Sequence, residues 1–358
     1  VWVSMHHLSD ASPMRRVSVC RTLTPLLKFV SLLFLSRKGL GVGMNLCMVG
    51  YGTIAKAHTR AFRDEGVTLD TVVGRLPERG AAFASEQGYA HSTTNLAEAL
   101  ARSEIDLVAI CSPSEAHAAQ AEQALMADKH VLVEIPLAMT YTEGRLLAGL
   151  ARERGKTLMV CHTHRYRSPM QEAKRRIARG ELTLHNIVSR YVFFRRENRD
   201  LTGKARSWTD NLLWHHGNHA TDLCLWLLGV TDVAGLSVTS QIALPDQKMS
   251  SFLDLTLLVR TPLDQLVSVN MSYNSHVSLC DYLLIGREES LVLPGQGPDT
   301  VNGVAAQDHD FLAAVRDGSE PAISAESVLP ALWVLQQAQD QYNTFLQHRP
   351  GAAHPIAP

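Results

Sequence analysis

Three histidines and an aspartate, His215, His216, His219 and Asp222, stand close together in the sequence. On a helix, His215 and His219 are four residues apart and lie on one face, and Asp222 lies three residues beyond His219. An imidazole titrates near neutral pH, so it suits a group that must take a proton from a substrate. We expect His219 to be the base, with Asp222 orienting it or anchoring the helix. His215 would contact the substrate. The alternative is that one or more of the histidines, His216 above all, caps or packs the helix.

The spacing of His215 and His219 also occurs in zinc sites. In the metalloprotease pattern His-Glu-x-x-His, a glutamate that acts as general base would occupy position 216, which is a histidine here. We therefore expect no metal. The six cysteines form no CxxC pair, and most stand in apolar runs, which indicates reduced thiols and a cytoplasmic protein. They are Cys20, Cys47, Cys111, Cys161, Cys224 and Cys280.

A glycine motif, G-x-G-x-x-A, covers residues 50–55 between a predicted strand and a predicted helix. Gly50 permits a tight turn, Gly52 lets the backbone approach a pyrophosphate, and the small Ala55 allows close packing of helix and strand. The amides of the helix N-terminus then face the phosphates. The alternative is a glycine turn without a ligand. We expect a dinucleotide to contact Gly50, Tyr51, Gly52, Thr53 and Ile54.

The end of the second predicted strand, Thr71–Val73, bears on the choice of nicotinamide cofactor. An acidic residue there would bind the ribose 2′-hydroxyl of NAD. The sequence has Gly74 and Arg75 instead, and an arginine suits a 2′-phosphate. We expect NADP, with NAD less favoured; in the alternative reading Arg75 is a solvated loop residue.

Strands and helices that alternate along residues 44–162 indicate parallel βαβ units, and hence an α/β Rossmann domain. The expected strands are Leu46–Val49, Thr71–Val73, Asp106–Ile110, His130–Glu134 and Thr157–Cys161, and the helices include Pro77–Gln87, one capped by Asn95, Glu115–Ala127 and Thr142–Arg154.

The rhythm changes after residue 163, and residues 163–347 are expected to form an α+β domain for substrate binding and oligomerisation, with an open, mainly antiparallel sheet. Its expected helices are Pro169–Arg179, Leu212–Leu228, Asp308–Arg316 and Ser327–Phe345, and its strands Asn186–Arg195, Gly235–Leu244, Ser251–Val259, Leu266–Tyr273 and Tyr282–Val292.

The two ends of the chain are treated separately. Residues 1–43 are expected to be a disordered extension or a misassigned start, with an export signal as the weaker alternative, because Pro25 and Lys28 interrupt their apolar run. Residues 348–358 are expected to be a flexible tail. The 34 basic and 35 acidic side chains nearly cancel, so we expect neither a nucleic acid nor a membrane surface as partner.

Four segments together resemble the glucose-fructose oxidoreductase / inositol dehydrogenase family. They are the glycine motif with Cys111-Ser112-Pro113 and His117, Glu134-Ile135-Pro136 in place of Glu-Lys-Pro, the histidine segment 215–222, and the late strand Tyr282–Val292. The resemblance implies a NAD(P)-dependent dehydrogenase in which Cys111, Ser112, Pro113, His117, Glu134, Ile135 and Pro136 contact the cofactor. Ile135 cannot exchange a proton as the family's lysine can, so that task falls to the histidines.

Further segments resemble members of this family that oxidise the cyclic hemiacetal of a carboxylated semialdehyde to a lactone with NADP. They are residues 134–138, 161–165, 193–196, 205–210 and 213–216. A hemiacetal carbon bears both H and OH, so loss of a hydride and a proton gives the lactone without a cysteine intermediate. The alternatives are a family member acting on another sugar, polyol or hydroxy acid, and a non-catalytic NADP-binding sensor.

A dicarboxylate substrate requires cationic side chains. Arginine binds carboxylates bidentately, so we expect substrate contacts from Arg165, Arg195, Arg196 and Arg206, with His164 and Trp208 as further candidates. The apolar alternation of residues 253–259 fits either a core or an interface. The family resemblance suggests a homodimer or higher homo-oligomer.

Overall fold

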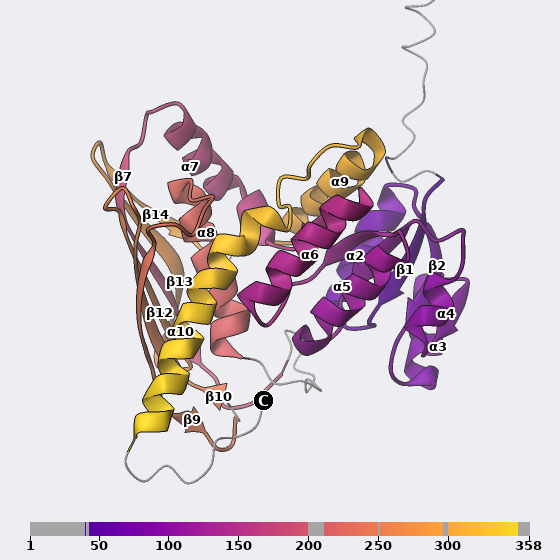
Figure 1. Ribbon diagram of the computed structural model, residues 1–358, viewed down its shortest axis with the longest axis horizontal. Coiled ribbons are helices and arrows are strands. Elements are labelled where there is room, and N and C mark those ends of the chain that lie inside the picture. Colours follow the sequence, from indigo (N-terminus) through magenta and orange to yellow (C-terminus); the bar gives the residue numbers. More distant parts are fainter. Residues whose placement is uncertain (1–39, 41–42, 200–210, 250, 296–299, 350–358) are drawn as a thin grey trace, which may run out of the picture. The chain divides into compact units, whose positions relative to one another are not determined.

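The structure is a computed structural model that describes residues 40, 43–199, 211–249, 251–295 and 300–349 (Figure 1). The expectation for the N-terminal extension therefore lies outside the described residues, apart from positions 40 and 43. The flexible tail likewise falls outside them, except for residues 348 and 349. None of the described helices combines the length and the apolar character needed to cross a bilayer.

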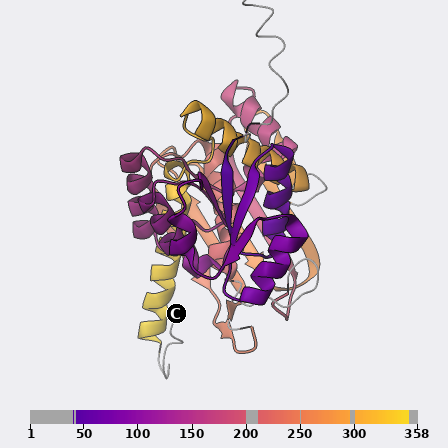
Figure 2. The same cartoon turned by 90° about the vertical axis from the view of Figure 1, so that its right-hand side faces the viewer.

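The first sheet has six parallel strands in the order β3-β2-β1-β4-β5-β6, the Rossmann order. Figure 2 turns the domain that contains this sheet, in indigo and purple, toward the reader. The strands of this sheet are short and, except for the edge strand β3, mostly buried, because helices connect each strand to the next. Five strands were predicted; the sixth, β3, has three largely exposed residues and no apolar pattern. The strands are β1 Asn45–Val49, β2 Thr68–Val73, β3 His91–Thr93, β4 Leu107–Ile110, β5 His130–Val133 and β6 Leu158–Val160.

The connecting helices begin where side chains satisfy the free amides of their first turns. The Asn95 side chain accepts a hydrogen bond from the Glu98 amide, as the sequence predicts, and Thr140 does the same for Glu143. Two of the helices end at a left-handed glycine, Gly88 and Gly155. The helices are α2 Thr53–Asp64, α3 Pro77–Gln87, α4 Leu96–Leu100, α5 His117–Met126 and α6 Tyr141–Arg154.

The second sheet has six strands in the order β14-β13-β7-β12-β11-β8, all antiparallel except the β7–β12 pair. The predicted strand Tyr282–Val292 is wrong, because the chain reverses at residues 287–289 and forms two paired strands. The strands are β7 Leu184–Phe194, β8 Ser237–Ile242, β11 Asp254–Arg260, β12 Leu266–Ser272, β13 Asn274–Gly286 and β14 Ser290–Pro294, with a two-residue pair β9 Pro245–Asp246 and β10 Ser251–Phe252.

One face of the second sheet packs on helices. The core beneath this face includes Leu255, Leu257 and Val259, which are buried. Of the two readings of their apolar alternation, core or interface, the structure therefore supports the core. The helical elements are the 3-10 turns Ser114–Ala116, Thr163–Tyr166 and Glu326–Val328, α7 Ser168–Ala178, a π-helical turn at Leu212–Gly217, α8 Asn218–Leu228, α9 Thr300–Asp317 and α10 Leu329–His348.

Helix α9 returns from the second sheet to contact the first domain. It packs on α2, where the rings of Phe62 and Phe311 meet edge to face at 6.3 Å. Just beyond it, Ser324 forms an antiparallel bridge to Met159 at the edge of β6. The last third of the chain therefore contributes to the first domain as well as the second.

We predict that Phe311→Ala lowers the free energy of unfolding by about 3–5 kcal/mol, because a fully buried ring leaves a cavity between α9 and α2. Urea unfolding followed by circular dichroism measures it. Phe345→Ala is the matched control, since that ring is half exposed. A loss for Phe311→Ala no larger than that of the control would contradict the described packing.

Candidate active site

The turn between β1 and α2 has the backbone that the glycine motif predicts. Gly50 has φ +109°, and a Cβ atom there would lie 2.5 Å from the carbonyl oxygen of Cys111, so no other residue fits. Gly52 precedes the first turn of α2, and the space beside its Cα is open. Ala55 is fully buried. The amides at the start of α2 are therefore accessible to a phosphate.

The end of β2 carries an aromatic platform and exposed cations. The Tyr51 ring lies directly against Gly74, and its hydroxyl accepts a hydrogen bond from the Leu76 amide at 3.2 Å. The guanidinium of Arg79 lies 5.1 Å above the same ring. Arg75 is exposed beside this platform. No carboxylate occupies residues 74–77, where a NAD-preferring Rossmann fold places one.

The loops after β4 and β5 are joined by His117. Its ring nitrogens lie 2.8 Å from the carbonyl oxygen of Pro136 and 2.9 Å from that of Ser112, and the side chain is buried. The structure thus places Cys111, Ser112 and Pro136 together at the carboxyl edge of the sheet. The sequence predicts that His117 contacts the cofactor. In the structure both of its ring nitrogens lie beside carbonyl oxygens of the two loops that are also predicted to contact the cofactor.

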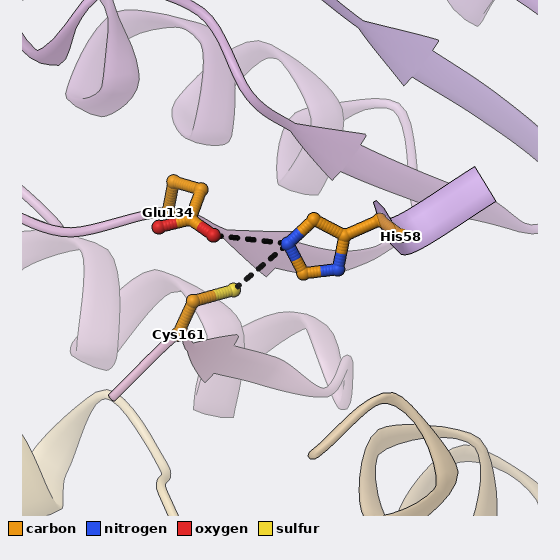
Figure 3. A group of neighbouring side chains, drawn as sticks. All are labelled: His58, Glu134 and Cys161. Carbon is orange, nitrogen blue, oxygen red and sulfur yellow. Dashed lines mark hydrogen bonds and ion pairs between the residues drawn. The ribbon is translucent and has the colours of Figure 1, made fainter. Parts of the chain in front are cut away.

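A buried histidine, His58, joins distant segments of the chain, and Figure 3 shows it facing Glu134 and Cys161. His58 of α2 lies with Nδ1 2.8 Å from an Asp308 carboxylate oxygen and Nε2 2.9 Å from Glu134 Oε1. The Cys161 sulfur is 4.0 Å from the same Nε2. Burial alone would lower the pKa of His58, but the two carboxylates raise it to about 10. His58 is therefore an imidazolium between two carboxylates.

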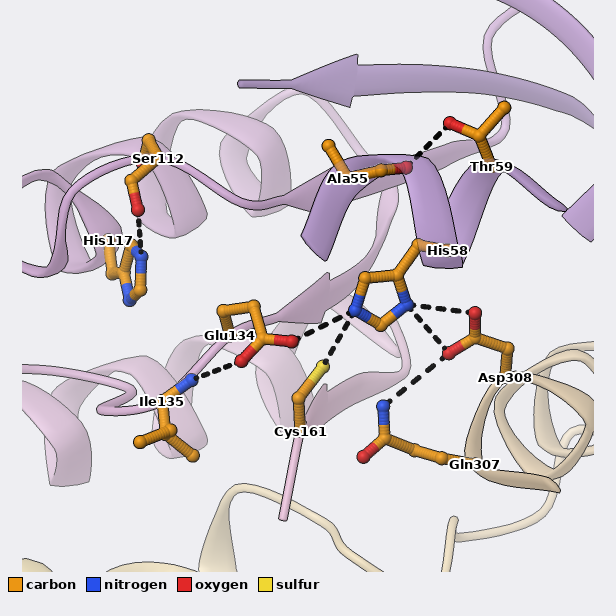
Figure 4. A network of polar contacts seen from close by, with 10 residues as sticks. All are labelled: Ala55, His58, Thr59, Ser112, His117, Glu134, Ile135, Cys161, Gln307 and Asp308. Carbon is orange, nitrogen blue, oxygen red and sulfur yellow. Dashed lines mark hydrogen bonds and ion pairs between the residues drawn. The ribbon is translucent and has the colours of Figure 1, made fainter. Parts of the chain in front are cut away.

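Glu134 is the member of this group that reaches toward solvent. Its side chain is 17% exposed, whereas those of His58 and Asp308 are fully buried. Burial opposes its ionisation, yet the hydrogen bond and charge of His58 hold the pKa of Glu134 below its ordinary value. Figure 4 shows its second oxygen turned toward the Ile135 amide, at 3.3 Å. The sequence indicated Glu134 only by family resemblance, and His58 and Asp308 not at all.

The predicted histidines His215 and His219 lie in one cluster with His164, also predicted, and with His162, which was not predicted. The rings of His164 and His219 stack at 4.5 Å, and His162 contacts His219 edge to face at 5.9 Å. His215 contacts both His216 and His219, at 4.7 and 6.0 Å between ring centres. Five imidazoles thus form one cluster, and His162 directly follows Cys161 beside Glu134.

Burial keeps His162, His164 and His219 of this cluster uncharged at neutral pH. Burial lowers the pKa of His162 and of His164 to about 4. The positive charge of Arg165 also lowers the pKa of His162, and that of Arg167 also lowers the pKa of His164. Burial and the surrounding histidines hold the pKa of His219 well below its ordinary value. Among the described residues, His219 Nδ1 is buried without a hydrogen-bond partner. A neutral imidazole of this kind can accept a proton.

Comparisons with known proteins bear on this arrangement. Residues 44–162 match the model of the oxidoreductase family with an NAD-binding Rossmann fold, and residues 169–289 match that of bacterial oxidoreductase C-terminal domains. The chain is 32% identical over 314 residues to the 4-carboxy-2-hydroxymuconate-6-semialdehyde dehydrogenase of Sphingobium sp. (strain NBRC 103272 / SYK-6), covering 83% of this chain and 98% of that protein.

The chain belongs to the glucose-fructose oxidoreductase / inositol dehydrogenase family. It is a NAD(P)-dependent dehydrogenase, as the sequence predicts. Solved structures show the same fold. GenD2 from gentamicin A biosynthesis in complex with NAD has a TM-score of 0.74 at 22% identity over 86% of this chain and 97% of that one. Levoglucosan dehydrogenase with NADH and levoglucosan has a TM-score of 0.72 at 18% identity over 84% and 97%.

In this dehydrogenase Asp222 pairs with Arg165 rather than with His219. The guanidinium donates two hydrogen bonds to the carboxylate, at 2.8 and 2.5 Å, and further ones to Ser327. Asp222 also lies 3.2 Å from His162. Both partners are almost fully buried. The arrangement supports Asp222 as an anchor of α8, and it leaves Arg165 little hydrogen-bonding capacity for a substrate carboxylate.

The remaining arginines lie at the end of β7. Arg195 donates to backbone carbonyls of residues 197 and 199 and lies 5.3 Å above the Tyr273 ring. Arg196 donates to the carbonyls of Arg195 and Tyr273. Both side chains remain partly exposed. Arg206 and Trp208 lie outside the described residues, so the structure does not bear on their predicted contacts.

The buried cluster predicts a pH-dependent stability. The pKa of His162 is about 4 in the fold and about 6.5 in the unfolded chain. Between these values the unfolded state binds more protons, so the contribution is complete above pH 6.5 and is lost as the pH falls toward 4. We expect His162→Gln to flatten the pH dependence of the unfolding free energy by roughly 1 kcal/mol per pH unit across this window.

Urea unfolding at pH 7.5, 6.0 and 5.0 measures this slope for wild type and variant. His185→Gln is the control, because His185 is exposed on β7. Parallel profiles for wild type and His162→Gln would show that His162 is not held neutral by the fold.

Proposed function

We propose that this dehydrogenase oxidises the cyclic hemiacetal of 4-carboxy-2-hydroxymuconate-6-semialdehyde to 2-pyrone-4,6-dicarboxylate with NADP, a step of protocatechuate 4,5-cleavage. The likeness to the dehydrogenase named for this semialdehyde, which extends over 98% of that relative, supports the substrate. The histidine cluster beside the cofactor edge supports the chemistry, and it is the observation on which the proposal rests.

The hemiacetal carbon carries one hydrogen and one hydroxyl. A bound nicotinamide nucleotide would supply the hydride acceptor for this carbon. The hydroxyl proton passes to His219, and the C–O bond becomes the carbonyl of the lactone. Atoms and electrons balance, since the carbon loses two electrons with the hydride and the oxygen loses a proton.

His219 suits this proton transfer because burial keeps it unprotonated before the substrate arrives. A base with so low a pKa is weak on its own. A substrate that carries carboxylates brings negative charge beside the imidazole, which raises its pKa at the moment when a proton must be taken. His164, stacked on His219, fixes the plane of the ring.

The cysteines of the described chain do not support a covalent route. Burial raises the pKa of the Cys111 and Cys161 thiols well above the ordinary value, and that of Cys47 and Cys280 to about 12. A thiol attacks an aldehyde only as the thiolate. Direct loss of hydride from the hemiacetal is therefore the route that fits these side chains.

NADP preference is part of the proposal. Arg75 is exposed at the end of β2, with Arg79 and the Tyr51 ring next to it, and this group suits a phosphate on the adenosine ribose. Carboxylate recognition by Arg195, Arg196, Arg206, His164 and Trp208 stays a prediction. Self-association of the chain also stays a prediction.

We predict that His219→Gln lowers kcat at least about 100-fold, because the amide cannot accept the hydroxyl proton. The assay follows NADPH absorbance with the ring-cleavage semialdehyde as substrate. Nucleotide affinity, measured by calorimetry, should stay within twofold of wild type. His185→Gln is the control for a distant histidine. A kcat within threefold of wild type would remove His219 from the reaction.

We predict that Arg75→Ala raises KM for NADP roughly tenfold and leaves KM for NAD unchanged, since a charge-assisted hydrogen bond to the 2′-phosphate is lost. Steady-state kinetics with both nucleotides measure the change. Arg145→Ala, exposed on α6, is the control for loss of a surface cation. Equal effects on the two nucleotides would refute the assignment of Arg75.

A further inference from the structure

The group Asp308–His58–Glu134 lies where the reactive end of a bound dinucleotide would be expected. In this strand order the pyrophosphate binds at the turn after β1, and the adenosine half extends over β2, so the nicotinamide half extends over β4 and β5. Glu134 directly follows β5, and its amide donates a hydrogen bond of 2.9 Å to the carbonyl of Ile110, the last residue of β4. Its carboxylate is the partly exposed end of the group.

The charge of the group follows from its hydrogen bonds. Both ring nitrogens of His58 lie within 2.9 Å of carboxylate oxygens (Figure 4). The pKa of His58 is raised to about 10, so the ring is protonated at neutral pH and both nitrogens donate. One cation between two anions leaves a net charge of about −1. Burial of Asp308 on α9 raises the pKa of its carboxyl group, whereas the charge and hydrogen bond of His58 and a hydrogen bond from Gln307 at 3.4 Å favour the carboxylate.

We propose that the Glu134 carboxylate, held in place by His58 and Asp308, is a specificity residue that favours the oxidised nicotinamide nucleotide over the reduced one. The inference rests on the proposed binding of a nicotinamide cofactor. The oxidised ring carries a positive charge and the reduced ring does not, so a fixed anion at low dielectric stabilises the two unequally. His58 and Asp308 are positioning residues for this anion.

The same side chains could be taken for a metal site, because ligand atoms of His58, Glu134 and Cys161 lie within 4.8 Å of one another. Metal binding would require removal of the Nε2 proton from a histidine whose pKa is raised to about 10 and of the proton from a thiol whose pKa is raised well above 9.0. Hydrogen bonding among these groups accounts for their positions without an ion.

Glu134→Gln tests the proposal, because the amide keeps the size and the oxygen that accepts from His58 but removes the charge. Calorimetry gives Kd for NADP+ and NADPH, with NAD+ and NADH as a parallel pair. Wild type should bind NADP+ at least as tightly as NADPH. In the variant the ratio of Kd for NADP+ to Kd for NADPH should rise roughly fivefold or more. Glu134→Asp, which keeps the charge, should keep the wild-type ratio to within twofold.

Glu122→Gln, exposed on α5, is the control for loss of a surface carboxylate. A Glu134→Gln ratio within twofold of wild type would overturn the inference. If circular dichroism shows that Glu134→Gln does not fold, the ratio of the two Kd values in the wild-type protein tests the inference. Tighter binding of NADPH than of NADP+ by wild type would overturn the inference. Wild-type protein that binds none of the four nucleotides would instead contradict the proposed function.

Discussion

Two charged hydrogen bonds, from His58 to Asp308 and to Glu134, join three segments and determine how this molecule is organised. His58 lies on α2, the helix that begins at the glycine turn, and Glu134 follows strand β5. Asp308 lies on α9, 250 residues after His58 in the chain. Asp308 and Glu134 both stabilise the buried imidazolium, so loss of either carboxylate would weaken the attachment of its segment to His58. The cofactor helix, the edge of the sheet and the returning helix α9 are therefore held in one arrangement.

Much of the fold could be predicted because its signals are local. The glycine turn, the helix Pro77–Gln87 and the cap at Asn95 depend on residues a few positions apart. Two features of the sheets were not predicted, and the reasons are also local. Strand β3 is three mostly exposed residues without alternation, and the reversal after Gly286 passes through Arg287, Glu288 and Glu289, which contain no turn signal of the Asn-Gly kind.

The candidate site could be predicted only in part, because burial and pairing are properties of the fold. Sequence pattern indicated His215 and His219 but not that His162, which follows β6, would join them. Arg165 was predicted as a ligand for substrate carboxylates, yet the carboxylate it binds is Asp222, 57 residues away. His58 has an ordinary position one turn into a helix, and nothing near it in the sequence indicates its two acidic partners.

The protonation state of His58 tests this account most directly. Nitrogen-15 NMR of the imidazole in the full chain reports whether each ring nitrogen carries a proton. The account predicts that both nitrogens of His58 remain protonated at pH 8, where an ordinary histidine has lost one proton. A neutral His58 at that pH, with one bare nitrogen, would contradict it.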